Sequence, residues 1–316
     1  MKNFKIFAGT ASFALAKKVA QKLSVGLGKA EIVRFADGEC RARVEEELGR
    51  EMVFVIQTLC PPVDENLIEL CLLGDALKRN GAQKLVAIVP YLGYARQDIA
   101  HRKGECISAS VVARIIEDVG FEKIITFDVH SSKALAFFKI PTENLSAFAA
   151  LTEAVRLALG LSLKEQEKQK KEKLLDFAVV APDTAAISRA KKLAKELGTT
   201  VVVIEKDRDL LTGKLKIKGV KGEIVGRKLV ICDDMVTSGG TLILAAEFLK
   251  RQRAAKILAC AVHPLLVKNA KQDLQMSVIE KVIVTDAIPV PNEKMFKKLE
   301  IVTVAPLIAQ AIADSV

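Results

Sequence analysis

The chain has 316 residues, 50% of them hydrophobic, which is enough for one large core or two ordinary ones, and we expect two domains. Its net charge of +10 comes with only 5% aromatic residues, a composition that favours small anionic substrates over nucleic acid as partners. No apolar run approaches the roughly 20 residues that span a bilayer, and residues 1–20 carry lysines throughout, unlike a signal peptide. The six cysteines include no CxxC pair. We therefore expect a cytoplasmic protein without membrane attachment.

Similar segments recur in the same order along the chain. "GREMVFVI" from Gly49 matches "GRKLVICD" from Gly226, and "LKRNGAQKLVAIVPYL" from Leu77 matches "LKRQRAAKILACAVHPL" from Leu249. These matches indicate a duplication, with extra loop residues in the first half between about 93 and 110. Each half alternates apolar strands with amphipathic helices. We therefore expect an α/β fold of two duplicated, doubly wound domains with mostly parallel sheets.

The charge-dense segment 159–176 is the expected join between the halves. Within it, Ser162 and Glu165 fit a capping box at the start of a solvated helix. We place the first domain at residues 1–156 and the second at 157–304. Residues 305–316 are a candidate to pack on the first domain.

The segment "VRFADGEC" holds the first candidate site residues. Phe35, Asp37 and Glu39 would lie on one side of an extended or turning segment, which gives an aromatic platform beside two acceptors. A purine would suit that arrangement. The competing interpretation is an ordinary surface turn at Asp37 and Gly38.

Two further candidates follow in the first half. "PYLGYARQD" lies in the extra loop and offers Tyr94, Arg96 and Gln97, and loops of this kind on a rigid scaffold tend to carry function. The apolar segment "IITFDVH" ends on His130, which could bind a metal or a phosphate, although a lone histidine is more often structural.

In the second half, "AVVAPDTAAISRAKKLAKEL" reads as a strand, an acid, a turn of small residues and a helix. Asp183 would lie at the strand end, and the start of the helix after it can take up negative charge. The alternative is that Asp183 only caps this helix.

The polar stretch 205–227 is predicted to be a mobile flap or a hairpin between two strands. Lys206 and Arg208 lie at its start. They are either ordinary surface charges or, in a flap that closes over phosphates, groups that stabilise a transferring phosphoryl group.

The segment "VICDDMVTSGGT" combines a buried strand, two acids and a glycine turn. We expect the strand to stop at Asp233 and Asp234, at the edge where open α/β sheets bind ligands. The turn 237–241 offers hydroxyls and backbone N–H groups before an apolar helix, which suits a phosphate. Carboxylates for vicinal hydroxyls beside a phosphate site indicate a sugar phosphate.

Taken together, these segments resemble the ribose-phosphate pyrophosphokinase family, also called the phosphoribosyl pyrophosphate synthetases. The resemblance covers nearly the whole chain, and the flap and "RKGECISAS" look closest to archaeal-type members. It implies phosphoribosyltransferase-like domains, the first on the ATP side and the second binding ribose 5-phosphate. The motifs are "FADGE", "GYARQD", "FDVH", "APD", "EKDRDLLTG", "ICDDMVTSGGT" and "VIVTDAIPVP".

The resemblance implies transfer of the diphosphoryl group of ATP to the 1-hydroxyl of ribose 5-phosphate, with Mg²⁺ as cofactor. It also implies a homo-oligomer, a dimer or a multiple of dimers. There, Phe35, Asp37 and Glu39 would receive the adenine across a subunit interface, and Arg96 and Gln97 would bind ATP from the other subunit.

By the same resemblance, Lys206 and Arg208 would be catalytic, and His130 and Asp183 would be magnesium ligands. The acid pair would hold the ribose hydroxyls, and the turn after it would hold the 5-phosphate. These ribose 5-phosphate residues are Asp233, Asp234, Thr237, Ser238, Gly239, Gly240 and Thr241.

The sequence departs from the family pattern at two places. Ala185 and Ala186 stand where the family has at least one glycine in its pyrophosphate loop, and Ser238 stands where threonine is usual. Two alternatives to the synthetase remain open. A phosphoribosyltransferase would carry the same acid and glycine turn, and a catalytically silent regulatory relative would share the fold.

Overall fold

The structure is a computed structural model that describes residues 4–161, 176–208 and 215–316, with only the backbone described at positions 207, 208, 215 and 216. The chain divides into two compact units. The first runs to Ser146 and includes Ala287–Pro289 and Thr303–Val316. The second comprises Ala147–Asp286 and Val290–Val302.

The division differs from the expected join after residue 156. That position lies inside helix α5 (Phe148–Leu159), which packs as a whole on β12, β13 and β14 of the second unit through buried residues such as Leu151 and Val155. At the other end, helix α9 (Ala305–Ser315) belongs to the first unit and contacts α1 (Phe13–Leu23). The helix expected at Ser162 and Glu165 lies outside the described residues.

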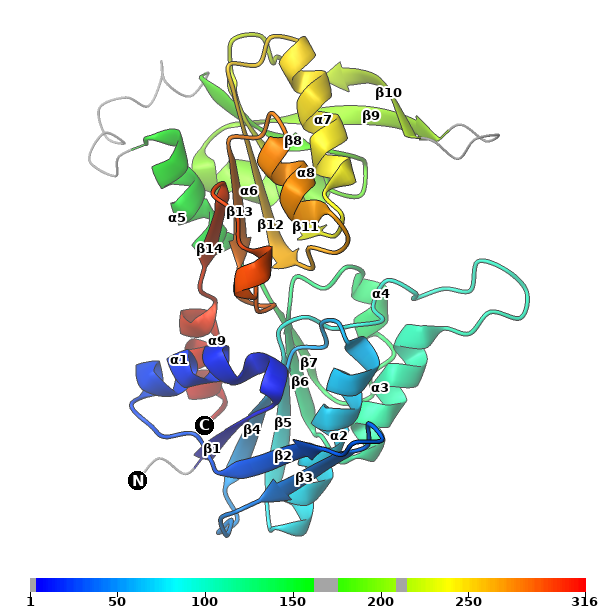
Figure 1. The fold of residues 1–316 in the computed structure, drawn as a ribbon, viewed down its shortest axis with the longest axis vertical. Helices are drawn as coiled ribbons and strands as arrows, with labels where there is room; N and C mark the ends of the chain where they lie inside the picture. Colours follow the sequence, from blue (N-terminus) through cyan, green and yellow to red (C-terminus); the bar gives the residue numbers. More distant parts are fainter. Residues whose placement is uncertain (1–3, 162–175, 209–214) are drawn as a thin grey trace. The chain divides into compact units, whose positions relative to one another are not determined.

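The first unit is built on a five-stranded parallel sheet of order β1-β4-β5-β6-β7. Figure 1 shows α1 and α9 on one side of this sheet and α2 and α3 on the other. The antiparallel pair β2–β3 forms a separate small sheet that contacts α2. The bounds are β1 (Phe4–Ala8), β2 (Ala30–Arg34), β3 (Cys40–Val44), β4 (Met52–Ile56), α2 (Val63–Arg79), β5 (Lys84–Val89), α3 (Ser108–Asp118), β6 (Lys123–Phe127), α4 (Ser132–Leu135) and β7 (Thr142–Leu145).

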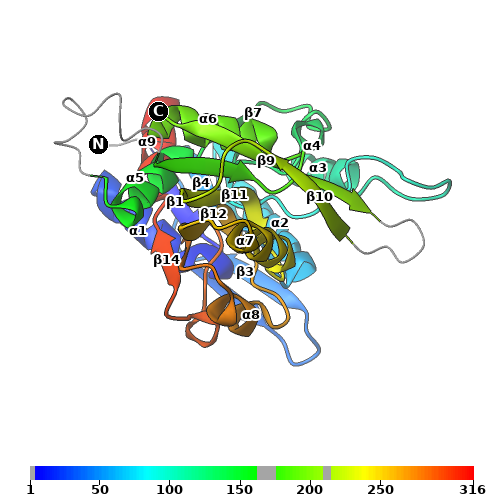
Figure 2. The ribbon, with the colours of Figure 1, turned by 90° about the horizontal axis from the view of Figure 1, so that it is seen from above.

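The second unit is built on a seven-stranded sheet of order β10-β9-β8-β11-β12-β13-β14, in which only β10 is antiparallel to its neighbour. Helices α5 and α6 contact each other, and α7 contacts α8. The β9–β10 pair reaches beyond the other strands in both views (Figures 1 and 2). The bounds are β8 (Phe177–Ala181), α6 (Ile187–Leu197), β9 (Thr200–Arg208), β10 (Leu215–Lys221), β11 (Lys228–Val236), α7 (Gly240–Arg251), β12 (Lys256–Pro264), α8 (Ala270–Met276), β13 (Lys281–Thr285) and β14 (Leu299–Val302).

The two units repeat one topology. The strands β8-β11-β12-β13-β14 have the same order and direction as β1-β4-β5-β6-β7. The extra loop of the first half is the connection 90–107 between β5 and α3, whose counterpart between β12 and α8 is only 265–269. One difference matters for the site: β9 joins its sheet beside β8, whereas β2 stays outside the first sheet.

The strands form where the sequence is continuously apolar, as expected for parallel strands that are covered on both faces. β8 is buried along its whole length, and β4 is buried from Val53 to Ile56. Helix α6 buries the stripe Ala190, Leu193, Ala194 and Leu197 and leaves lysines outside. Among the described residues, no helix is both long and apolar enough to cross a bilayer.

Candidate active site

The strand order of the second unit creates a switch point between β8 and β11. From β8 the chain passes through α6 to β9 on one side, and it returns to β11 on the other side. Open α/β sheets bind ligands at the carboxyl ends of the two strands that flank such a point. Asp183 follows β8, and Asp233 and Asp234 lie near the end of β11.

The expectation that the strand stops at the acid pair is wrong. β11 continues to Val236, because its neighbour β12 extends equally far and pairs with it up to Pro264. On its other side, the pairing of β11 with β8 ends at Ile231. Asp233 and Asp234 therefore lie on a stretch of β11 that is paired on one side only, next to the start of the loop after β8.

The two carboxylates have different surroundings because successive strand residues point to opposite faces. Asp234 is 3% exposed, and its Oδ1 accepts a hydrogen bond from Nη2 of Arg189 at 3.0 Å. Asp233 is half-buried, and its Oδ1 accepts from the main-chain N–H of Asp234 at 2.9 Å. Burial, together with the neighbouring Asp234, raises the pKa of Asp233 to about 7.

Lys206 completes this group of charges. It lies on β9, the neighbour of β8, and is half-buried. Burial lowers the pKa of its ammonium group, while the charges of Asp183 and Asp233 oppose that shift. A cation and two acids therefore influence one another at the same sheet edge. Arg208 ends β9, but its side chain and residues 209–214 of the flap lie outside the described residues.

The turn after the acid pair is shaped for an anion. Gly239 has φ +80°, and a Cβ there would lie 3.1 Å from Leu274 of α8, so this position requires glycine. Helix α7 begins at Gly240, and the first N–H groups of a helix have no partner within it. Its start is therefore able to receive an anion, and the phosphate site predicted at Thr237, Ser238, Gly239, Gly240 and Thr241 stays a prediction.

The loop after β8 has a cap geometry. Oδ1 of Asp183 accepts from the main-chain N–H of Ala186 at 3.1 Å, so the capping interpretation describes its local contact. Ala185 is exposed, Ala186 is buried, and the carbonyl oxygen of Ala185 accepts from Nη1 of Arg189 at 3.0 Å. Arg189 thus contacts both this loop and Asp234, a connection that the sequence pattern did not predict.

In the first unit, residues 35–39 form the turn between β2 and β3. The main-chain N–H of Phe35 donates to the carbonyl oxygen of Glu39 at 2.8 Å, and Gly38 has φ +96°. The surface-turn interpretation is thus correct for the backbone. It leaves Phe35, Asp37 and Glu39 exposed, with the ring of Phe35 5.8 Å from the guanidinium carbon of Arg41.

Arg96 and Gln97 lie in the connection 90–107. Arg96 is exposed, whereas Oε1 of Gln97 accepts from the hydroxyl of Ser108 at 2.6 Å, which fixes it at the start of α3. His130 is exposed just after β6. Beside it, Ser131 donates to Asp98 at 2.5 Å, and this hydrogen bond lowers the pKa of Asp98, with smaller contributions from the charges of Lys133 and His130.

Asp98 is a residue that the sequence reasoning missed as a site candidate. The signal was present, since Asp98 directly follows Gln97 in a loop whose strand β5 pairs with β6, the strand before His130. His130 and Asp183 belong to different units. Among the described residues, no three His, Cys, Asp or Glu side chains gather into a metal-binding cluster.

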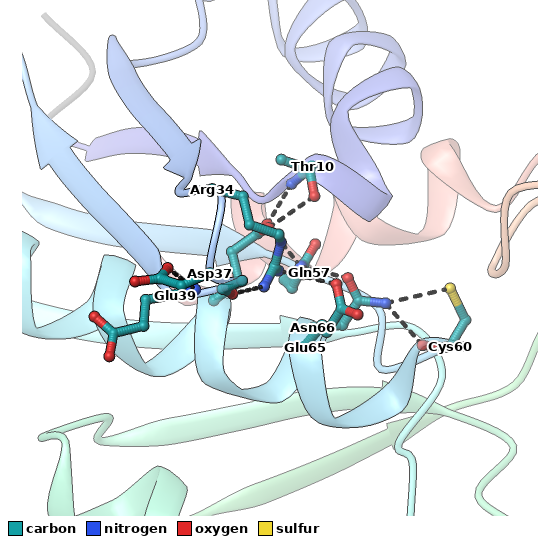
Figure 3. Close-up of polar contacts among 10 residues, drawn as sticks. Thr10, Arg34, Asp37, Glu39, Gln57, Cys60, Glu65 and Asn66 are labelled. Atoms are coloured by element: carbon teal, nitrogen blue, oxygen red, sulfur yellow. Dashed lines mark hydrogen bonds and ion pairs between the residues drawn. The ribbon is translucent and has the colours of Figure 1, made fainter.

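The first turns of α2 connect the two ATP-side candidates of the first unit. Glu65 pairs with Arg34 at 3.2 Å, at the base of the β2–β3 turn, and Asp64 accepts a hydrogen bond from Tyr94 of the 90–107 loop. Figure 3 shows Arg34 and Glu65 beside the polar side chains of Asp37 and Glu39. These contacts link elements that are distant in sequence, so no local pattern could reveal them.

A buried hydrogen-bond network fills the edge of the first sheet that corresponds to the acid pair of the second. Nε2 of Gln57, just after β4, donates to Glu69 at 2.8 Å and lies 3.3 Å from Oδ1 of Asn66 (Figure 3). Glu69 is 2% exposed and also accepts from the N–H and hydroxyl of Thr10. The two units thus share a topology, but this edge carries a buried side-chain network in the first unit and the acid pair in the second.

Comparison with known proteins decides the family. A family model described as the N-terminal domain of ribose phosphate pyrophosphokinase matches residues 4–120, and one described as a phosphoribosyl synthetase-associated domain matches residues 139–315. The chain belongs to the ribose-phosphate pyrophosphokinase family. Members of the ribose-phosphate pyrophosphokinase family are enzymes, and the fold and the ordered motifs are in agreement with that assignment.

Curated relatives in this family cover nearly the whole chain. Ribose-phosphate pyrophosphokinases from Ralstonia nicotianae and Bacillus caldolyticus are 37% and 35% identical over 96% and 98% of this chain and 92% and 94% of theirs. The crystal structure of phosphoribosylpyrophosphate synthetase from Mycobacterium smegmatis matches with a TM-score of 0.87 and 32% identity over 99% of both chains. These ribose-phosphate pyrophosphokinases are bacterial, and the expected likeness to archaeal-type members is not supported.

Proposed function

We propose that this chain transfers the diphosphoryl group of ATP to the 1-hydroxyl of ribose 5-phosphate, giving 5-phosphoribosyl 1-pyrophosphate and AMP. The observation that carries the proposal is the acid pair on β11, followed by an anion-binding turn and flanked by Asp183 and Lys206 at one switch point. This edge provides acceptors for hydroxyls, donors for a phosphate and a cation for a charged group in transfer. We place this reaction in the cytoplasm.

Ribose 5-phosphate is assigned to the second unit. Asp233 and Asp234 accept hydrogen bonds from the ribose hydroxyls, since carboxylates recognise vicinal hydroxyls well. The 5-phosphate binds the backbone N–H groups and hydroxyls at the start of α7, where the helix dipole adds to the attraction. The exposed position of Gly240 at this start supports the assignment.

ATP is assigned to residues of the first unit. The adenine stacks on Phe35, which is 46% exposed, beside the carboxylates of Asp37 and Glu39. Arg96 and Gln97 bind ATP in a neighbouring copy of the chain. This arrangement requires a homo-oligomer, a dimer or a multiple of dimers, in which one subunit supplies the adenine platform to the site of the next.

Catalysis is assigned to Lys206 and Arg208, which stabilise the negative charge of the diphosphoryl group in transfer. Asp183 fits a magnesium ion, because it is a half-buried carboxylate at the edge and Mg²⁺ takes oxygen ligands from one or two carboxylates together with substrate phosphates. His130 of the first unit is a further magnesium ligand that we propose. When bound, the ion supplies charge neutralisation for the phosphates.

A coupled assay for AMP tests the proposal. Purified protein is incubated with ATP and Mg²⁺, with and without ribose 5-phosphate, and AMP formation should require the sugar. Release of AMP without the sugar would contradict the assignment. A phosphoribosyltransferase would instead consume 5-phosphoribosyl 1-pyrophosphate with a nucleobase, and a silent regulatory relative would give no turnover in either assay.

A further inference from the structure

Arg189 occupies a distinctive position in the second unit. It lies in the first turn of α6, and its guanidinium group reaches two different segments. Nη2 lies 3.0 Å from Oδ1 of Asp234 on β11, and Nη1 donates to the carbonyl oxygen of Ala185 at 3.0 Å. One rigid, planar group therefore joins the acid pair to the loop that follows Asp183.

The ion pair between Arg189 and Asp234 is largely buried. The two side chains are 18% and 4% exposed. A buried carboxylate is costly unless a cation and hydrogen bonds compensate its charge, so removing the arginine would take away a nearby cation from Asp234. The Nε of Arg189 is itself buried and finds no hydrogen-bond partner among the described residues, whereas the two Nη atoms contact Asp234 and the carbonyl oxygen of Ala185.

We infer that Arg189 is a positioning residue that sets the distance between the segment that holds the ribose hydroxyls and the loop after Asp183, which opens α6 and which we assign to the diphosphate. It acts through Asp234 and Ala185 and does not touch the reacting atoms. This inference rests on the proposed function. A ligand that carries both a ribose and a diphosphate, such as 5-phosphoribosyl 1-pyrophosphate, contacts both segments at once and depends on their spacing. Ribose 5-phosphate or pyrophosphate alone contacts one segment each.

Arg189→Lys separates the two contacts. A lysine keeps the charge near Asp234, but its single ammonium group cannot reproduce the planar fork that reaches both partners. We expect the dissociation constants of ribose 5-phosphate and magnesium pyrophosphate for this variant to stay within about threefold of wild type. The dissociation constant of 5-phosphoribosyl 1-pyrophosphate should rise about tenfold, which is the scale of a coupling between contacting groups. Arg189→Met removes both contacts, so we expect this variant to bind ribose 5-phosphate more weakly as well.

The experiment is calorimetric titration of the three ligands into wild type, Arg189→Lys and Arg189→Met, with the melting temperature of each variant recorded. Lys192→Met is the matched control, since it removes an exposed cation from the same helix. If Arg189→Met does not fold, the double variant Arg189→Met with Asp234→Asn also removes the buried negative charge and should melt at a higher temperature than the single variant.

Equal losses for all three ligands in Arg189→Lys, or a lower melting temperature with unchanged affinities, would overturn the inference and leave Arg189 as a structural residue only. Failure of the proposed function gives a different result. In that case wild type itself would bind neither ribose 5-phosphate nor 5-phosphoribosyl 1-pyrophosphate.

Discussion

The carboxylate of Asp233 accepts a 2.9 Å hydrogen bond from the main-chain N–H of Asp234, the adjacent acid on the same strand. This contact does not offset the cost of holding two acids together in a largely buried place, and the pKa of Asp233 is raised to about 7. The sheet edge thus keeps an arrangement that is unfavourable for two negative charges. Such local cost is common where a protein stores binding or catalytic groups.

The first prediction follows from this raised pKa. The unfolded chain titrates its aspartates near pH 4, so the folded state binds the proton of Asp233 more tightly, and the stability linked to it is lost as pH rises from about 4 to about 7. Asp233→Asn should therefore be more stable than wild type by about 1–3 kcal/mol at pH 8 and should have no such advantage at pH 4. Thermal unfolding of the two proteins at pH 8 and at pH 4, with a chelator present, measures both stability differences.

Asp118→Asn controls for the change in net charge, because this aspartate is exposed at the end of α3. It should leave stability nearly unchanged at both pH values. A less stable Asp233→Asn at pH 8 would contradict the cost assigned to the acid pair.

The second prediction concerns the turn before α7. Gly239→Ala should destabilise the protein by about 1–2 kcal/mol, because an alanine with positive φ is strained and its Cβ would crowd Leu274. Gly240→Ala is the neighbouring control: its added Cβ would meet nothing nearer than the Ser238 hydroxyl at 3.7 Å. Urea unfolding compares the two. Similar losses at both positions would show that Gly239 is not specifically required.

The third prediction tests the shared adenine site. Phe35→Ala should weaken ATP use while the fold stays intact, because the side chain is exposed and contributes little to the core. If a neighbouring subunit supplies Phe35, mixing Phe35→Ala with Lys206→Ala should restore part of the activity that each variant has lost, because mixed oligomers contain sites with both residues intact. Absence of recovery, despite mixing confirmed by mass spectrometry of tagged chains, would mean that one chain builds each site alone.

The fourth prediction separates catalysis from binding at Lys206. Lys206→Ala should lower turnover by roughly a hundredfold, the scale of losing one preorganised charge of about 3 kcal/mol, while substrate affinities stay within a few-fold of wild type. Lys221→Ala on β10 is the control, since its ammonium group is exposed and pairs with Glu205. Steady-state kinetics of the variant measure turnover and substrate affinity. Normal turnover would mean that Lys206 is not catalytic, and a loss of ATP affinity with normal turnover would make it a binding residue.

The sequence predicted well what depends on local pattern. The continuous apolar runs gave the parallel strands, and the glycine turn after Asp234 predicted the start of α7. The predicted end of β11 was wrong because the length of this strand depends on its partner β12. The compact units divide before the expected join because the buried face of α5 packs on the second sheet. Both depend on tertiary contacts, which cannot be predicted from the sequence of one segment alone.

The contacts that organise the site could not be predicted for the same reason. The pairs of Arg189 with Asp234 and of Arg34 with Glu65 join residues far apart in the chain, and an arginine on a helix is in most cases a solvated charge. Asp98 is different, since its place after Gln97 was visible in the sequence. Its contact with Ser131 became evident only once β5 and β6 were paired.

The buried network of Gln57, Asn66 and Glu69 also bears on how the two halves diverged after duplication. Loss of Glu69 alone would remove the acceptor that the buried Gln57 side chain shares with Thr10, and a buried donor that loses its acceptor costs about 1–3 kcal/mol. A change at Glu69 without matching changes at its partners therefore gives a less stable protein. Single substitutions are therefore not expected to restore a ligand edge in the first half. We expect the difference between the two halves of the chain to persist during evolution.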